Sequence, residues 1–118
     1  MFGKSNNKIN ILDVTPIRRS HISTYIMDDG RVRLGILRFK SKWVNKYFLP
    51  NKISPEIKVP LDVHGSEVWK LIDGNRTIRK IIIQLATHFE NQVDYEERIV
   101  TYLYQLKKDQ LIDFISAR

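Results

Sequence analysis

The stretch at residues 59–74 divides the chain into a β-like half and a helical half. Asp62 can accept hydrogen bonds from the N–H groups of a first helical turn, so it predicts a helix start. Gly74 follows Asp73 and predicts a helix stop, because glycine readily takes the left-handed conformation. Between them, four residues share one face at helical spacing: Gly65, Val68, Trp69 and Ile72.

Residues before this helix predict a sheet. Residues 23–27 are rich in β-forming side chains, Asp29-Gly30 favours a hairpin turn, and residues 32–37 alternate in polarity. Residues 43–49 and 57–61 are further strand candidates. Because Pro60 has no N–H to donate to a neighbouring strand, we expect residues 57–61 at the sheet edge.

Residues after it predict two more helices. Thr77 is a candidate N-cap for a helix whose apolar face is Ile78, Ile81, Ile82, Leu85, Ala86 and Phe89. Asp94 and Glu97 resemble a capping box at the start of the third helix, which is expected to end near Lys108. Its core stripe is Ile99, Leu103 and Leu106. Residues 111–114 form an apolar tail that could pack back as a strand.

Strands followed by helices indicate an α+β fold, here an antiparallel three-stranded sheet followed by three helices. Short helices joined by brief loops also suit a winged helix-turn-helix-like arrangement. The length of 118 residues fits one modest core. We therefore expect an extended or partly disordered arm at residues 1–20 and a single domain at residues 21–118.

Composition excludes several classes of protein. The chain has no cysteine, which excludes disulfides, thiolate catalysis and cysteine-ligated zinc or iron–sulfur sites. Its three histidines are isolated from one another, so neither a metal site nor an enzyme is expected, and no cofactor. The chain lacks a membrane-length apolar run and a signal peptide, so we expect a cytoplasmic protein with no membrane partner.

The net charge of +7 belongs to the N-terminal half. Residues 1–60 hold twelve Lys and Arg against four Asp and Glu, whereas later residues nearly balance. A basic face indicates an anionic partner, either nucleic acid or an acidic peptide, although it can also be a solvated surface.

The central and helical residues resemble the PqqD family, also called RiPP recognition elements. The resemblance covers roughly residues 32–114, and the residues that carry it are Leu61, Asp62, Gly65, Val68, Trp69, Asp73, Gly74, Thr77, Ile81, Phe89, Arg98, Tyr102, Leu103, Leu106, Leu111 and Ile112. It implies a non-catalytic peptide chaperone that binds the leader segment of a ribosomally made precursor peptide. It further implies that the leader is presented to a modifying enzyme, commonly a radical S-adenosylmethionine (radical SAM) protein.

By the same resemblance, the leader adds as a strand to the third strand and lies against the third helix. The expected peptide-binding residues are Glu56, Ile57, Lys58, Val59, Tyr95, Arg98, Tyr102 and Gln105. Pro60 would end the docking register, or it could simply protect an edge against aggregation. The tyrosines could equally be core-edge residues, and an open edge would also permit a homodimer.

The alternative is a winged helix-turn-helix nucleic-acid-binding protein that uses the basic N-terminal half. Its phosphate-binding residues would be Arg31, Arg33, Arg38, Lys40, Lys42 and Lys46. The third helix would then enter the DNA groove, but it begins with Asp94, Glu96 and Glu97, which phosphates repel. DNA binding is therefore the less favoured hypothesis.

Overall fold

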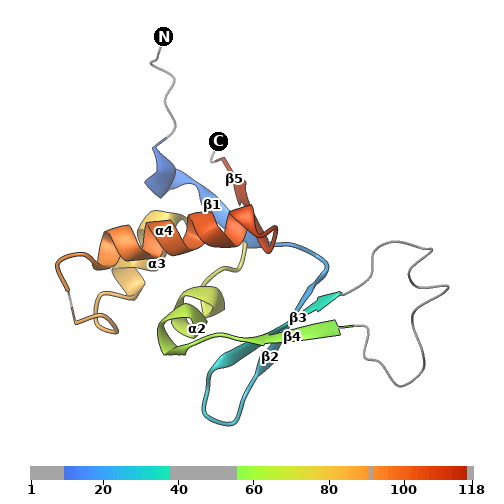
Figure 1. Ribbon diagram of the computed structural model, residues 1–118. Helices are drawn as coiled ribbons and strands as arrows, with labels where there is room; N and C mark the ends of the chain where they lie inside the picture. Colours follow the sequence, from blue (N-terminus) through green and yellow to red (C-terminus); the bar gives the residue numbers. More distant parts are fainter. Residues whose placement is uncertain (1–9, 38–55, 91, 117–118) are drawn as a thin grey trace, which may run out of the picture. The chain divides into compact units, whose positions relative to one another are not determined.

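The computed structural model describes residues 10–37, 56–90 and 92–116 (Figure 1). These residues form an α+β structure in which an antiparallel three-stranded sheet, ordered β2-β3-β4, precedes three α-helices, so the expected fold class is confirmed. The strand predicted at residues 43–49 lies outside the described residues. The chain divides into a sheet unit, Ser20–Ser66, and a helical unit, Met1–Arg19 with Glu67–Arg118.

The sheet unit begins with the predicted hairpin. Strands β2 (Ile22–Ile26) and β3 (Val32–Leu37) pair antiparallel, and β4 (Glu56–Pro60) pairs with the other side of β3. Gly30 takes a φ of +88° in the turn, which a residue with a Cβ rarely adopts. Among the described residues, no strand pairs with the other side of β4, so it is an edge strand of this sheet, as Pro60 predicts.

A buried hydroxyl completes the ladder between β3 and β4. Ser66 Oγ accepts a 2.8 Å hydrogen bond from the Val32 N–H and donates at 3.4 Å to the Leu61 carbonyl. Ser66 is only 1% exposed. The hydroxyl therefore gives the buried Val32 N–H an acceptor and also contacts the Leu61 carbonyl.

Helix α2 (Val63–Lys70) starts after the predicted cap, but it ends at Lys70, before the predicted stop at Asp73 and Gly74. The Gly65 N–H donates to Asp62 Oδ1 at 2.6 Å, which confirms Asp62 as a cap. Within the helical unit, Trp69 and Ile72 are fully buried, and Gly74 has a φ of +82°.

Helix α3 (Ile78–Gln84) begins at the predicted cap, because the Thr77 hydroxyl accepts from the Lys80 N–H at 3.2 Å. The helix ends at Gln84, and the apolar stripe continues through turns to Phe89, which is buried. Helix α4 (Tyr95–Lys108) buries the predicted stripe.

The predicted capping box at the start of α4 is wrong. Asp94 makes no side-chain cap hydrogen bond. Its φ of −100° and ψ of 12° are not the extended conformation that turns an N-cap side chain back toward the first turn.

The first and last described elements pair with each other. The 3₁₀ turn η1 (Ile11–Asp13) leads into β1 (Thr15–Arg18), which is antiparallel to β5 (Ile112–Ile115). The strand expected from the apolar tail is confirmed. The Ile78 N–H donates to the Val14 carbonyl at 2.9 Å, which ties the segment before β1 to the start of α3. The division into an arm and one domain stays a prediction.

Candidate functional site

The backbone of β4 presents hydrogen-bonding groups on the side away from β3. The Leu61 N–H donates to the Val32 carbonyl at 2.9 Å, so the backbone of Leu61 faces β3. Backbone groups alternate in direction along an antiparallel strand, so Pro60 and Lys58 face the opposite side. Lys58 thus directs an N–H and a carbonyl away from β3, whereas Pro60 directs only a carbonyl. This orientation matches the expectation from Pro60.

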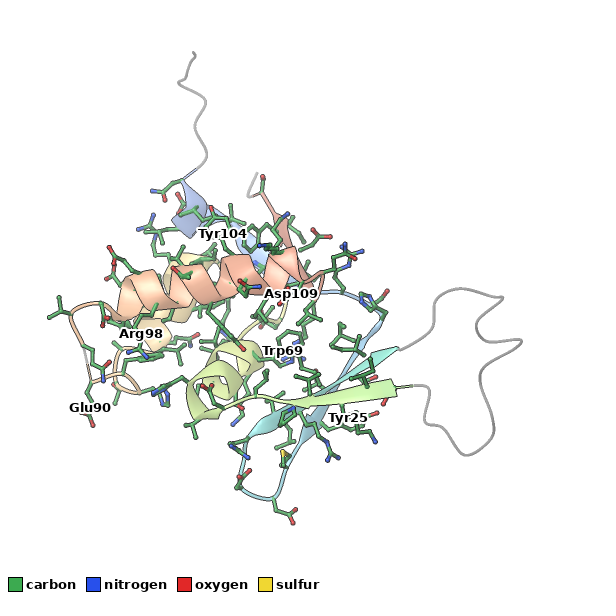
Figure 2. The ribbon with its side chains drawn as sticks, viewed as in Figure 1. Tyr25, Trp69, Glu90, Arg98, Tyr104 and Asp109 are labelled. Atoms are coloured by element: carbon green, nitrogen blue, oxygen red, sulfur yellow. The ribbon has the colours of Figure 1, made fainter. Side chains whose placement is uncertain are left out.

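One face of the sheet carries a cluster in which side chains of the two outer strands are hydrogen-bonded to each other. Tyr25 on β2, labelled in Figure 2, donates its hydroxyl to Glu56 Oε1 on β4 at 2.8 Å. Ser23 donates to Glu56 Oε2 at 3.2 Å. Gly35 on β3 lies between them, and a Cβ there would stand 2.7 Å from Glu56 Oε1. The glycine thus leaves the space in which the two side chains meet.

Two cations flank the Tyr25 ring on the same face. The Lys58 ammonium lies 5.5 Å from the ring centroid, and the Arg33 guanidinium carbon lies 5.9 Å from it. The hydrogen bond to Glu56 raises the pKa of Tyr25 above its usual value, and Arg33 opposes this shift. The face is therefore cationic at Lys58 and Arg33 and anionic at Glu56.

The opposite face of β4 is apolar. Ile57 and Val59 alternate with Glu56 and Lys58, so their side chains point to the other side of the sheet. Ile57 is 42% exposed and Val59 is half-buried. Strand β4 therefore offers an apolar row and a charged row on its two faces.

The α4 residues predicted to bind peptide are only partly together. Arg98, Tyr102 and Gln105 line one shallow hollow of about 480 Å³ on the helical unit. Its other lining residues are Asp94, Glu97 and Thr101. Two carboxylates thus accompany one guanidinium, and the hollow has no excess of positive charge.

Each of these α4 side chains already has contacts. Arg98, labelled in Figure 2, donates to Gln92 Oε1 at 2.9 Å, and Gln105 Nε2 donates to the Asp109 carboxylate. Tyr95 does not line the hollow. Its ring stacks on Phe89 with centroids 5.8 Å apart, so Tyr95 packs against the turns that follow α3.

Sequence reasoning missed the contributions of Tyr25, Ser23 and Arg33 to the β4 surface. Alternation along the hairpin places all three on one face, but only the register with β4 brings them beside Glu56 and Lys58. No local pattern in the sequence contains that register.

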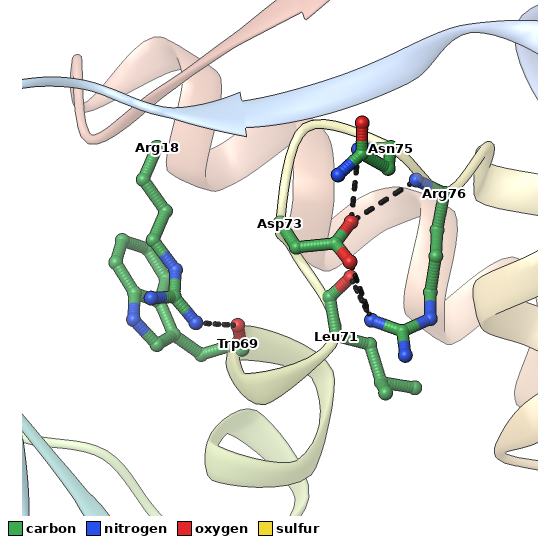
Figure 3. A network of polar contacts seen from close by, with 6 residues as sticks. All are labelled: Arg18, Trp69, Leu71, Asp73, Asn75 and Arg76. Carbon is green, nitrogen blue, oxygen red and sulfur yellow. Dashed lines mark hydrogen bonds and ion pairs between the residues drawn. The ribbon is translucent and has the colours of Figure 1, made fainter.

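A second polar network holds the end of α2 within the helical unit (Figure 3). Arg18 donates to the Trp69 carbonyl at 2.8 Å, and its guanidinium carbon lies 5.2 Å from the Trp69 ring centroid. Burial lowers the pKa of Arg18, and the nearby carboxylate of Asp73 opposes this. Asp73 accepts from the backbone N–H groups of Asn75 and Arg76, and these bonds lower its pKa.

Other kinds of site find little support in the part of the chain that the structure describes. No three His, Asp or Glu side chains there gather as metal ligands, and no helix there is long and apolar enough to cross a membrane. Of the basic residues expected to contact nucleic acid, Arg38, Lys40, Lys42 and Lys46 lie outside the described residues. The first turn of α4 carries Glu96 and Glu97, both exposed.

Comparison with known proteins decides the family. The model of the family described as coenzyme PQQ synthesis protein D (PqqD) matches residues 52–112, more than half of the chain. The chain belongs to the PqqD family. Comparisons with curated proteins and with solved structures find no match. Membership of the PqqD family is consistent with a non-catalytic accessory role in the biosynthesis of a cofactor or peptide. The PqqD match includes all of β4 and ends at the first residue of β5.

Proposed function

We propose that this PqqD-family protein is a non-catalytic peptide chaperone. It binds the leader segment of a ribosomally made precursor peptide and presents it to a modifying enzyme of the radical SAM type. The observation that carries the proposal is the orientation of β4, which is an edge strand among the described residues and whose Lys58 directs its N–H and carbonyl away from β3. An added peptide strand forms main-chain hydrogen bonds with groups of this kind.

Pro60 supports a defined docking register. It lies at the end of β4, and its nitrogen has no hydrogen to donate. Only the outward-facing residues before Pro60 can therefore donate backbone hydrogen bonds to an added strand. The hollow at Arg98, Tyr102 and Gln105 is a second candidate contact for the peptide, with an aromatic body and polar tips.

A proline substitution separates backbone docking from side-chain docking. Lys58→Pro removes the N–H that faces away from β3, and it leaves the β3–β4 ladder intact because that N–H is not part of it. Lys58→Ala keeps the N–H and removes the charge. We expect Lys58→Pro to weaken binding of peptides selected from a displayed random library by about tenfold, equivalent to the net loss of one hydrogen bond. Lys58→Ala should retain main-chain docking.

Amide chemical shifts locate the bound peptide. A selected peptide should shift the resonances of Ile57, Lys58 and Val59, and those along α4 from Tyr95 to Tyr102. Shifts confined to residues 31–46, or equal binding by Lys58→Pro and wild type, would contradict the proposal. Val59→Pro is the matched variant that should disrupt the sheet itself, because the Val59 N–H faces β3.

The nucleic-acid alternative makes a separate prediction. It requires affinity for duplex DNA that falls steeply as salt rises. The acidic first turn of α4 argues against base contacts by that helix. A flat DNA titration at low salt removes the alternative.

A further inference from the structure

The two faces of β4 differ in charge, and an added strand would share them. Side chains of neighbouring strands that point to the same face lie beside each other, and opposite charges in such pairs attract. On one face the β4 residues are Glu56 and Lys58, and on the other they are Ile57 and Val59. A partner strand therefore meets charge and apolar surface in alternation.

Lys58 is the cation at the centre of this edge. Its ammonium lies 5.5 Å from the centroid of the Tyr25 ring, and the guanidinium carbon of Arg33 lies 5.9 Å from the same centroid. Both cations therefore lie on the face that an anion beside Lys58 would share.

Glu56 restricts where that anion can lie. Its carboxylate accepts from Tyr25 at 2.8 Å and from Ser23 at 3.2 Å, which holds the negative charge at the start of β4. An acidic side chain beside Glu56 is repelled, whereas one beside Lys58, two residues further along, is attracted. The charged row therefore distinguishes between registers two residues apart.

The hollow on α4 does not supply this preference. Asp94 and Glu97 line it with Arg98, so its two carboxylates outnumber its one guanidinium. A preference for acidic residues in the peptide must therefore come from the face of the sheet that carries Lys58 and Arg33.

We propose that β4 selects an extended peptide that alternates apolar and polar residues, in which one Asp or Glu lies beside Lys58, an uncharged polar residue lies beside Glu56, and apolar side chains lie with Ile57 and Val59. This inference rests on the proposed function, because it assigns the chemistry of the peptide that adds to the same edge. It goes further by naming Lys58, Arg33 and Tyr25 as the specificity-determining group.

Four synthetic peptides test the selection by fluorescence anisotropy. The glutamate peptide alternates valine and threonine and carries one glutamate in place of a central threonine, and its lysine counterpart reverses that charge. A third, the threonine peptide, alternates valine and threonine throughout, which keeps β-propensity without charge. A fourth exchanges the glutamate with a neighbouring valine, which keeps the composition but places the acid on the apolar face. Wild type should bind the glutamate peptide most tightly, by roughly two- to fivefold over the threonine peptide.

Charge reversal at Lys58 provides the specific test. Lys58→Glu should exchange the preference, so that the lysine peptide binds roughly two- to fivefold more tightly than the glutamate peptide. Lys80→Glu is the matched control, since it changes the net charge equally at an exposed position on α3. It should keep the preference of wild type.

The outcomes separate the two proposals. If the threonine and glutamate peptides bind wild type equally and shift the amides of residues 57–59, strand addition holds and the charge selection is overturned. If Lys80→Glu alters the preference as strongly as Lys58→Glu, the selection is a property of net charge and the inference fails. If neither these peptides nor any library peptide shifts residues 57–59, strand addition itself is wrong.

Discussion

The hydroxyl of Tyr25 and the carboxylate of Glu56 join the two outer strands of the sheet by a 2.8 Å hydrogen bond that passes over Gly35 of the middle strand. This bond connects the hairpin to the strand that carries the proposed docking groups. It also places the Tyr25 ring against the side chain of Lys58. The cluster therefore couples the position of β4 to the charge that it presents.

Replacing Glu56 should lower the pKa of Tyr25. In the wild type the hydrogen bond to Glu56 raises this pKa above the ordinary 10.0. Glu56→Gln removes the charged acceptor, so the Tyr25 pKa should fall toward 10.0. A pH titration of tyrosine Cζ resonances by NMR measures it. Glu96→Gln, an exposed substitution on α4, is the control that should leave the Tyr25 pKa unchanged.

The raised pKa of Tyr25 also determines the direction in which the free energy of unfolding changes with pH. Because the folded-state pKa of Tyr25 is raised, its contribution to the free energy of unfolding is fully present below pH 10.0. That contribution is lost as the pH rises through the folded-state pKa. Glu56→Gln should therefore show a weaker loss of stability on alkaline titration, and equal slopes for both proteins would contradict the assignment.

Adding a methyl group at residue 35 should also lower the pKa of Tyr25. A Cβ at residue 35 would lie 2.7 Å from Glu56 Oε1 and 2.8 Å from Tyr25 Cε2. Both atoms belong to side chains that can move, so Gly35→Ala should displace them and break their hydrogen bond without unfolding the sheet. The expected result is a lowered Tyr25 pKa with native amide dispersion. An unchanged Tyr25 pKa would show that the two side chains do not need the space over Gly35.

Removing the buried hydroxyl of Ser66 should destabilise the sheet unit. Ser66→Ala leaves the Val32 N–H without its 2.8 Å acceptor, and Ser66 is only 1% exposed. The free energy of unfolding should fall by about 1–3 kcal/mol, the cost of a buried unsatisfied donor. Urea denaturation measures the change. Ser20→Ala, at an exposed position of the same unit, should change it by less than about 0.5 kcal/mol.

Arg18 should contribute to stability through Trp69. Arg18→Met keeps the apolar stem but loses the 2.8 Å bond to the Trp69 carbonyl and the contact with its ring. The expected loss is about 1–3 kcal/mol, as for a hydrogen bond with a charged donor. The fluorescence of Trp69 in a Trp43→Phe background reports unfolding.

Arg79→Met is the matched control for Arg18→Met. Its guanidinium makes an exposed ion pair with Asp13 at 3.0 Å, and such pairs contribute about 0–1 kcal/mol. If Arg18→Met and Arg79→Met lower the free energy of unfolding equally, the contacts of Arg18 with Trp69 stabilise the protein no more than an exposed ion pair does.

Asp73 should titrate below the ordinary 3.8 of an aspartate. The Asn75 N–H contributes most to the lowered pKa, and the backbone and guanidinium of Arg76 lower it further. A depressed pKa means that this stabilisation is present above pH 3.8 and is lost as the pH falls through the folded-state pKa. Carboxyl carbon NMR measures the titration directly. Arg76→Gln should raise the Asp73 pKa part of the way, and titration at or above 3.8 in wild type would contradict the structure.

Local signals were sufficient for most elements. The hydroxyl of Thr77 caps α3 as predicted, the turn at Gly30 joins β2 to β3, and Pro60 marks an edge strand. Each of these depends on one residue and its neighbours in sequence, so the chain carries the information locally. The local reading of Asp94 failed because its backbone conformation, which the residue type does not specify, turns the side chain away from the cap.

The sequence by itself determined the fold class, the caps at Asp62 and Thr77, the hairpin turn at Gly30, and the edge position of β4 among the described residues. Only the tertiary structure decided the pairing of Thr15 with Ile115, the bridging role of Ser66, and the cluster of Tyr25, Glu56 and Lys58. These contacts join residues far apart in the chain, and no periodic pattern specifies them. Their register is set by which buried faces pack together, so the charge presented at the edge of β4 emerges only when the sheet has formed.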